Sequence, residues 1–337
     1  MTATPPLSLH VLASVDLVRC VVAFQPGLPL DLLPFAQWIA LTPLLHPRLQ
    51  HQPHMQRLDM LLETLDRLLP RWTPPLSAWY ASFDPAASRV PVFCHHLPHL
   101  VPILAWEAVA SGRGDVLTYL HTHHLLTTEG APYFSDVAAA HGHVPLLLVL
   151  DSHGFAPCTT SAADRAAEKG HLEVVQYVYK RTDDRRRLPS SCAINYAAQH
   201  GHIQIVRWLH AQDASCSTFA LDWAAKGGHF DTVKFLHTHR REGCTTQAMD
   251  WAATNGHLAV VAFLHRHRSE GCTRMALVRA AERGHVPVVD YLVRHRDLLF
   301  VDAERVVQSA REAAVRVDQM DVAAYFDQLD QQSSAQS

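Results

Sequence analysis

The second half of the chain carries apolar residues at helical spacing in short blocks. Residues 246–254 place them at i, i+3 and i+4, and residues 258–264 form a second apolar stripe. Such spacing gives a helix one apolar face. Gly256 lies between the two stripes, and glycine adopts the left-handed conformation that ends a helix without a Cβ penalty. The pattern predicts two short helices joined by a tight turn.

This block is repeated along the chain. Its most regular part is Ala-Ala-x-x-Gly-His followed by an apolar stripe. Close copies begin at Ala138, Ala166, Ala197, Ala224, Ala252 and Ala280, a weaker one at Ala108 and a degenerate one near Ala313. The spacings between the anchor glycines run from 27 to 31 residues. Each hairpin has two apolar sides and cannot bury both alone, so we expect neighbouring hairpins to stack into a solenoid.

The run Ala-Ala-x-x-Gly-His-Leu-x-Val-Val-x-x-Leu, seen in Ala166–Val178 and Ala252–Leu264, resembles the ankyrin repeat. The resemblance covers roughly residues 100–330. It implies an all-α, ankyrin-like helical-hairpin solenoid that binds other proteins through its concave face and has no chemistry of its own. The usual ankyrin period is 33 residues, and the shortfall lies between one hairpin and the next. We therefore expect a short-loop variant without the family's long fingertips.

The repeat pattern predicts three regions. Residues 1–98 are rich in proline, lack the repeat and are predicted to form a helical region that caps the stack. Residues 99–330 form the array, and residues 331–337 are a polar tail that we expect to be disordered. A rival reading gives the first region a function of its own, because residues 28–35 faintly resemble the opening of an F-box. Under that reading the protein recruits substrates to a ubiquitin ligase.

Positions that vary while the scaffold letters repeat are candidates for a partner-binding surface. The column just before Ala-Ala holds Arg165, Tyr196, Trp223, Trp251 and Arg279. Aromatic residues and arginine are enriched in interface hot spots. These rings either contact a partner or pack between adjacent helices, and the sequence does not separate the two. Asp222 and Asp250 precede the tryptophans, and they either bond to neighbouring loops or face the partner.

The two residues between Ala-Ala and Gly-His also vary from copy to copy. In the ankyrin family this position lies near the concave face, and the alternative is plain solvated surface. The candidates from this column are Glu168, Lys169, Lys226, Thr254, Asn255, Glu282 and Arg283.

Neither catalysis nor metal binding is predicted. The sequence lacks G-x-S-x-G, H-E-x-x-H, a Walker loop and a G-x-G-x-x-G after a strand. Paired histidines such as His237 with His239 recur because the repeat recurs, and no cysteine spacing completes a four-ligand site. We assign histidines that follow the glycines, such as His229, to the turn. No cofactor, no catalytic residue and no metal ligand is expected.

Composition adds limits on partners and location. With 48% hydrophobic and 18% charged residues and a net charge of −3, the chain gives no general reason to expect nucleic acid or anionic membrane as a partner. It has no apolar run long enough to span a membrane and no secretion signal. We expect a monomer in the cytoplasm or nucleus that binds a protein partner. Cys158, Cys216, Cys244 and Cys272 recur in register and read as reduced packing residues.

Overall fold

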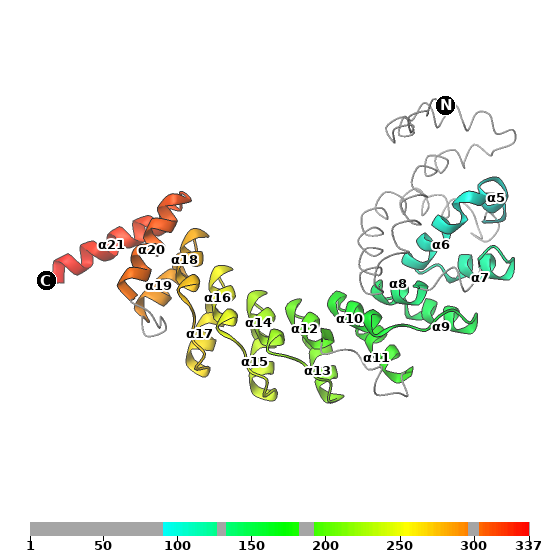
Figure 1. Cartoon of the computed structure of the whole chain (residues 1–337), viewed down its shortest axis with the longest axis horizontal. Helices are drawn as coiled ribbons and strands as arrows, with labels where there is room; N and C mark the ends of the chain where they lie inside the picture. Colours follow the sequence, from blue (N-terminus) through cyan, green and yellow to red (C-terminus); the bar gives the residue numbers. More distant parts are fainter. Residues whose placement is uncertain (1–89, 127–132, 182–191, 296–302, 337) are drawn as a thin grey trace, which may run out of the picture. The chain divides into compact units, whose positions relative to one another are not determined.

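The structure, a computed structural model, describes residues 90–126, 133–181, 192–295 and 303–336 (Figure 1). These residues form helices and no strand, which confirms the all-α prediction. The predicted cap within residues 1–89 and the F-box-like residues 28–35 lie outside the described residues. Both therefore stay predictions.

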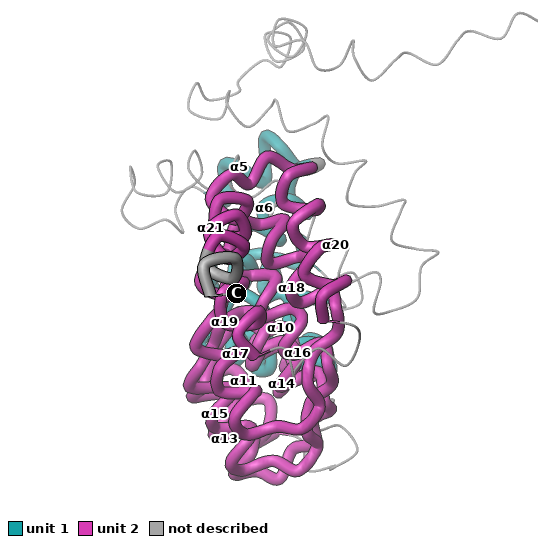
Figure 2. Tube along the Cα trace, turned by 90° about the vertical axis from the view of Figure 1, so that its left-hand side faces the viewer, with its two compact units in different colours: residues 1–162 teal, residues 163–337 magenta. Residues whose placement is uncertain are grey.

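Contacts divide the chain into two compact units, residues 1–162 and 163–337 (Figure 2). In the first, a short helix α5 (Val90–His96) and a 3-10 turn η4 (Pro98–Leu100) precede two hairpins. Those hairpins are α6 (Val101–Ala110) with α7 (Gly114–Thr122), and α8 (Phe134–Ala140) with α9 (Val144–Ser152).

The second unit consists of further hairpins of the same kind, and α10 begins three residues before it. The helix pairs are α10 (Thr160–Lys169) with α11 (Leu172–Arg181), α12 (Cys192–Gln199) with α13 (Ile203–Ala211), α14 (Phe219–Lys226) with α15 (Phe230–His239), α16 (Thr246–Thr254) with α17 (Leu258–His267), α18 (Arg274–Glu282) with α19 (Val286–Arg294), and α20 (Ala303–Arg316) with α21 (Met320–Gln336). Figure 2 shows two layers in this unit, with first helices such as α14, α16 and α18 on one side and second helices such as α13, α15 and α17 on the other. From α12 to α21, each helix packs on the equivalent helix of the next hairpin.

The layers approach closely because the facing side chains are small. Ala252 and Ala253 of α16 are fully buried, as are the equivalent alanine pairs of α10, α12, α14 and α18. On the second helix, Val261 and Leu264 fill the space beside them. Gly256 has φ +79°, and the glycine of every other described hairpin turn is also left-handed except in the last one. There Asp318 takes the left-handed position at φ 61°.

Connections between the regular hairpins are short, as the sequence predicts. Residues 240–245 join α15 to α16, and residues 268–273 join α17 to α18. Each connection contains an ion pair between residues two positions apart. Arg240 pairs with Glu242 at 2.6 Å, and Arg268 pairs with Glu270. No long finger projects from these two connections.

At the C-terminal end, helix α21 runs to Gln336. The predicted disorder of residues 331–337 stays a prediction. Extending a formed helix costs little, because each added residue gains a backbone hydrogen bond without a new nucleation step. The tail contains no glycine or proline that would stop it.

A buried acidic side chain joins consecutive first helices. The carboxylate of Asp222 accepts two hydrogen bonds from Thr245, from its amide at 2.8 Å and from its hydroxyl at 2.9 Å. Asp250 holds Thr273 in the same way at 2.7 Å for both bonds. Thr245 and Thr273 also cap the helices α16 and α18 that follow them. We call this pair of hydrogen bonds from a threonine to a buried aspartate the aspartate–threonine latch. The same latch joins Asp136 to Thr159 within the first unit.

The histidine that follows a turn glycine contacts the turn of the preceding hairpin. The ring covers the glycine of the preceding turn, where a Cβ on Gly201 would lie 2.4 Å from His229. In four of these histidines Nε2 donates to a carbonyl oxygen of the preceding hairpin, so this nitrogen carries the proton. The bonds join His143 to Ala110, His202 to Glu168, His229 to Gln199 and His257 to Lys226, at 2.7, 2.9, 2.9 and 3.2 Å. The sequence predicts that these histidines serve their own turn, whereas in the structure they reach across to the preceding one.

Removing one latch is expected to destabilise the fold. Asp250→Ala leaves the amide and hydroxyl of Thr273 without their acceptor, so urea unfolding should show a loss of about 1–3 kcal/mol. Asp327→Ala, at an exposed position of α21, should change the free energy of unfolding by less than about 0.5 kcal/mol. Equal effects of the two substitutions would show that the latch contributes nothing specific.

The histidine bridge predicts a pH dependence of stability. Burial lowers the pKa of His229 from 6.5, with further lowering by His257 and His202 against the bond to Gln199 that raises it. The unfolded chain therefore binds the proton first, and stability is complete above pH 6.5 and decreases as the pH falls below it.

His229→Gln tests this dependence, because Gln319 already occupies the equivalent position over Gly284. Urea midpoints measured at about pH 7.5 and about pH 5.5 should differ less in this variant than in the wild type. His239→Gln, at an exposed site, is the control and should keep the wild-type difference. An unchanged difference in His229→Gln would rule out His229 as its source.

Candidate protein-binding surface

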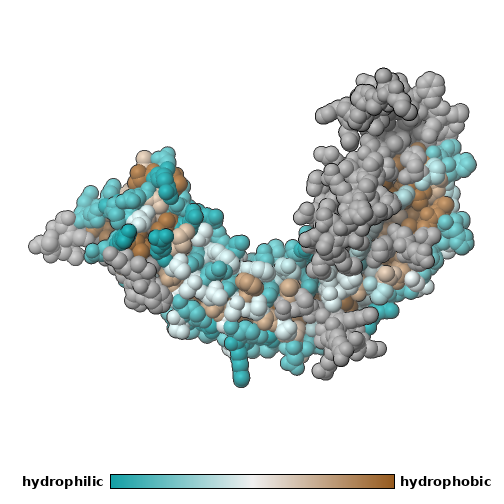
Figure 3. All heavy atoms as spheres, viewed as in Figure 1, coloured by the Kyte–Doolittle hydropathy of each residue, from teal (hydrophilic) through white to brown (hydrophobic). Residues whose placement is uncertain are grey.

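The first-helix layer of the second unit presents the column of residues that precedes the paired alanines. Tyr196, Trp223 and Trp251 are partly exposed, whereas the alanines that follow them are fully buried. The rings therefore lie on the outer side of this layer and not between the two layers. Figure 3 shows apolar residues scattered among hydrophilic ones over α12, α14 and α16.

The aromatic side chains of this column also touch one another. Tyr196 and Trp223 stack across two hairpins with ring centroids 5.8 Å apart. Phe219, one turn before Trp223 on α14, stacks on it at 5.2 Å. The guanidinium of Arg165 lies 5.9 Å from the centre of the Tyr196 ring. The two alternatives from the sequence are thus not exclusive, since the rings pack along the surface and keep part of their area exposed.

A groove lies between α14, α16 and α18 on this face, and we call it the Trp251 groove. The Trp251 groove encloses about 470 Å³. Seven of the twelve binding residues suggested by the sequence line it: Lys226, Trp251, Thr254, Asn255, Arg279, Glu282 and Arg283. The remaining lining residues are Gln247, Asp250 and Met275.

Hydrogen bonds between hairpins fix the floor of the Trp251 groove. The amide nitrogen of Asn255 donates to the carbonyl oxygen of Lys226 at 2.8 Å, and its oxygen accepts from Arg283 at 2.7 Å. The ammonium of Lys226 lies 5.4 Å from the centre of the Trp251 ring, within the range of a cation–π interaction. Three successive hairpins therefore contribute to one network.

Glu282, at the end of α18, lies beneath two arginine side chains. Its carboxylate binds Arg279 and Arg316, each at 2.6 Å. The Glu282 side chain is only 13% exposed, whereas those of Arg279 and Arg316 are 52% and 70% exposed. The acid is covered and the two guanidinium groups extend into solvent.

The other five suggested residues lie on the same layer but do not line the Trp251 groove. Arg165 and Glu168 form an ion pair at 2.5 Å on α10, and Lys169 is exposed at the end of that helix. Tyr196 and Trp223 form the aromatic stack described above.

The sequence argument missed Phe219, Gln247 and Met275. They stand four residues before Trp223, Trp251 and Arg279, one helical turn earlier on the same face. That spacing was the available signal. Phe219 and Met275 are 46% and 37% exposed, high for large apolar side chains.

Asp222 and Asp250 direct their carboxylates to the threonines of the neighbouring connections, although Asp250 also borders the Trp251 groove. Both are buried, and their carboxylates are occupied by the threonine latch. Burial raises the pKa of each carboxyl, and the bonds from threonine oppose that shift. Of the two alternatives left by the sequence, the bond to the neighbouring loop is the one found.

Histidines near the ends of the second helices stack on aromatic rings four residues earlier. One ring nitrogen of each also bonds a backbone carbonyl and is not available to a metal ion. His239 stacks on Phe235 at 4.3 Å, and its Nδ1 bonds the Phe235 carbonyl at 3.0 Å. His295 does the same with Tyr291. Within the described ranges, no group of three or more potential ligands is placed to hold a metal ion.

The described cysteines form no disulfide with one another. Burial raises the pKa of the Cys244 and Cys272 thiols to about 12, so they are protonated and poorly nucleophilic at neutral pH. Of the helices that the structure describes, none has the length and apolar character to cross a membrane.

A substitution separates the surface role of Trp251 from a packing role. Trp251→Ala removes a cation–π contact worth about 0.5–1 kcal/mol and part of an exposed ring. Met249→Ala on the same helix opens a cavity at a fully packed site and should cost about 2–5 kcal/mol. Urea unfolding should rank Trp251→Ala clearly as the milder change. A cost as large as that of Met249→Ala would make the ring a structural element.

Comparison with known proteins agrees with this architecture. The family model described as ankyrin repeats (3 copies) matches residues 164–250, 194–273 and 221–303. A search of curated proteins gave no match. The matched residues are the helix pairs from α10 to α19, which carry the repeated alanines, turn glycines and histidines. Over residues 164–303, the chain therefore matches the ankyrin repeat family in sequence, and its helix pairs follow the same repeat.

Proposed function

We propose that the protein is a non-catalytic scaffold that binds a protein partner on the first-helix face of its second unit. Ankyrin repeats are protein-interaction modules, and this gives the general class of function. The more specific assignment to this face, the concave face in the family, is our inference.

The convergence in the Trp251 groove supports the proposal most strongly. Seven residues that differ between repeats come from α14, α16 and α18 and meet around one ring. Aromatic and arginine side chains near the centre of a groove are typical of residues that dominate binding energy. A structural role alone does not require the variable positions to gather in one place.

The groove is also rigid enough to recognise a partner. Asn255 ties α16 to its neighbours on both sides, and the Asp222 and Asp250 latches fix the spacing of α14, α16 and α18. A preorganised surface loses less conformational entropy when a partner binds.

Catalysis receives no support from the described residues. The carboxyls of Asp222 and Asp250 are held in latches, the Cys272 thiol is buried, and the Trp251 groove is lined by no nucleophile next to a base. The family's usual role as a binding module agrees with this interpretation.

The proposal is tested with three full-length baits in a native lysate. They are the wild type, the double variant Trp223→Ala with Trp251→Ala, and a control with Phe230→Ala and Lys234→Ala on the second-helix layer. Partners should be lost at least about tenfold from the tryptophan variant, a change of about 1.4 kcal/mol, and kept by the control. Circular dichroism confirms that each bait is folded.

Retention of every partner by the tryptophan variant would refute binding at this face. The same experiment addresses the F-box-like alternative. A ubiquitin-ligase core subunit that stays with both variants and is lost after substitution within residues 28–35 would support the adaptor function.

A further inference from the structure

We infer that the partner segment on this face is an extended acidic peptide with one aromatic or large aliphatic anchor. This inference rests on the proposed function and adds the chemistry of the ligand. It depends on two adjoining grooves and on the charges left unpaired around them.

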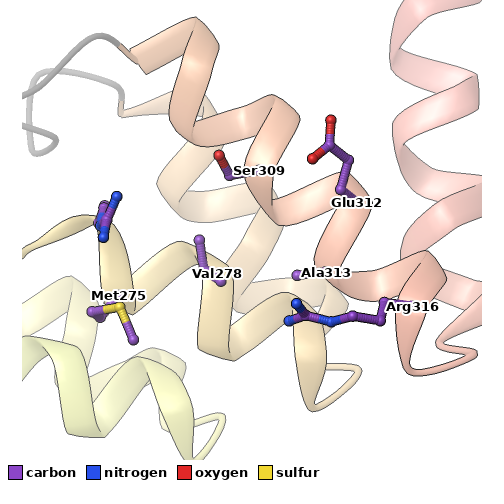
Figure 4. A pocket seen from close by; sticks show the side chains of 7 residues that line it. Met275, Val278, Ser309, Glu312, Ala313 and Arg316 are labelled. Carbon is purple, nitrogen blue, oxygen red and sulfur yellow. The ribbon is translucent and has the colours of Figure 1, made fainter.

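The second groove continues the surface towards the C-terminus, and we call it the Arg316 groove. It encloses about 420 Å³ between α18 and α20. Figure 4 shows Met275 and Val278 on α18, with Ser309, Glu312, Ala313 and Arg316 on α20. Met275 lines both grooves, so the two form one path across the four first helices α14, α16, α18 and α20.

Cations outnumber the free anions along this path. Lys226, Arg274 and Arg283 have no carboxylate partner among the described residues, since Lys226 contacts only a ring and Arg283 only an amide. The acids are already engaged, Asp250 by Thr273 and Glu282 by two arginines. Only Glu312, which accepts a bond from Gln308, opposes the positive charge. A cationic path on a chain of net charge −3 is a local feature that selects an acidic ligand.

The aromatic rings lie at the end of the path opposite to most of the unpaired cations. Phe219, Trp223 and Trp251 occupy α14 and α16, whereas most of the unpaired cations lie on α18 and its C-terminal flank. A ligand that fits both ends places its anchor over the rings and its carboxylates near the arginines. The two ends of the path therefore differ, and a ligand can bind both in one orientation only.

Spacing follows from elementary dimensions. Neighbouring packed helices lie about 8–10 Å apart, and an extended peptide advances about 3.3 Å per residue. One hairpin thus corresponds to roughly three peptide residues. Anchor and carboxylates should be separated by about three to six residues, since they are one or two hairpins apart.

A peptide is favoured over a nucleic acid strand by the acids inside the path. Glu282 and Glu312 would lie close to a continuous line of phosphates, which a strand cannot avoid. A peptide carries carboxylates only where arginine is available, and arginine binds carboxylate through two parallel hydrogen bonds.

Selection from a random linear peptide library of about twelve residues, displayed and presented to the full-length protein, tests the inference. Enrichment of Asp or Glu about three to six residues from an aromatic or aliphatic residue is the expected result. Selected peptides should bind more weakly as the salt concentration rises.

Matched variants then locate the binding. Lys226→Gln with Arg283→Gln removes two groove cations, and Lys234→Gln with Arg266→Gln removes two exposed cations from the second helices. The groove variant should lower affinity by about three- to thirtyfold, and the control by less than about twofold. Equal losses of affinity in the two variants would show that only the overall charge of the protein attracts the peptide, and this would overturn the inference.

The remaining outcomes are also decisive. Neutral or basic binders that are lost in Trp223→Ala with Trp251→Ala would overturn the acidic ligand and leave the proposed function intact. Binders unaffected by that double variant would contradict the proposed function as well. A library without binders, or tighter binding of a single-stranded oligothymidine than of any selected peptide, would also overturn the inference.

Discussion

The binding face depends on the buried carboxylate that one first helix offers to the start of the next. Asp222 and Asp250 each accept two bonds from a threonine that also begins the following helix. A buried charge without partners is costly. The latch is therefore favourable only when the threonine sits at one position, and this sets the register between hairpins. Neighbour-to-neighbour interactions of this kind are what a repeat array has in place of a global core.

Because register is set inside the layer, the outer side of the same helices is free to vary. Trp251 lies next to Asp250 in the chain, yet the acid points inward and the ring outward. Substitution of the ring leaves the latch in place, whereas substitution of the acid disturbs two helices at once. This separation lets a row of arginine, tyrosine and tryptophan residues differ between repeats on a constant scaffold.

The sequence predicted the elements of this fold well, for physical reasons. Helical spacing of apolar residues, paired alanines and left-handed glycines are local signals, so the hairpins and their turns could be read directly. The latch was harder, because Asp250 and Thr273 are 23 residues apart and only the structure shows which neighbour each one meets. The reach of His229 to Gln199 was misassigned for the same reason, since the bond spans 30 residues.

The candidate site was predicted in part. Variation between repeats identified Trp251, Asn255 and Arg283, which line the groove. It did not identify Met275, although this residue stands one turn before Arg279 on the same face. Nor could it show that Glu282 is covered by Arg279 and Arg316, because α20 belongs to a degenerate repeat whose register has one extra residue.

The degenerate last hairpin explains where the positive charge comes from. In the regular repeats, a histidine bonds the carbonyl of the preceding hairpin, and here Gln319 stands at that place over Gly284. Helix α20 is longer than the first helices before it, and it brings Arg316 back onto Glu282 of α18. One acid then serves two arginines, so the net charge of that corner is positive although each ion pair is formed. A terminal repeat that departs from the consensus therefore does more than close the stack, because it changes the electrostatics of the groove beside it.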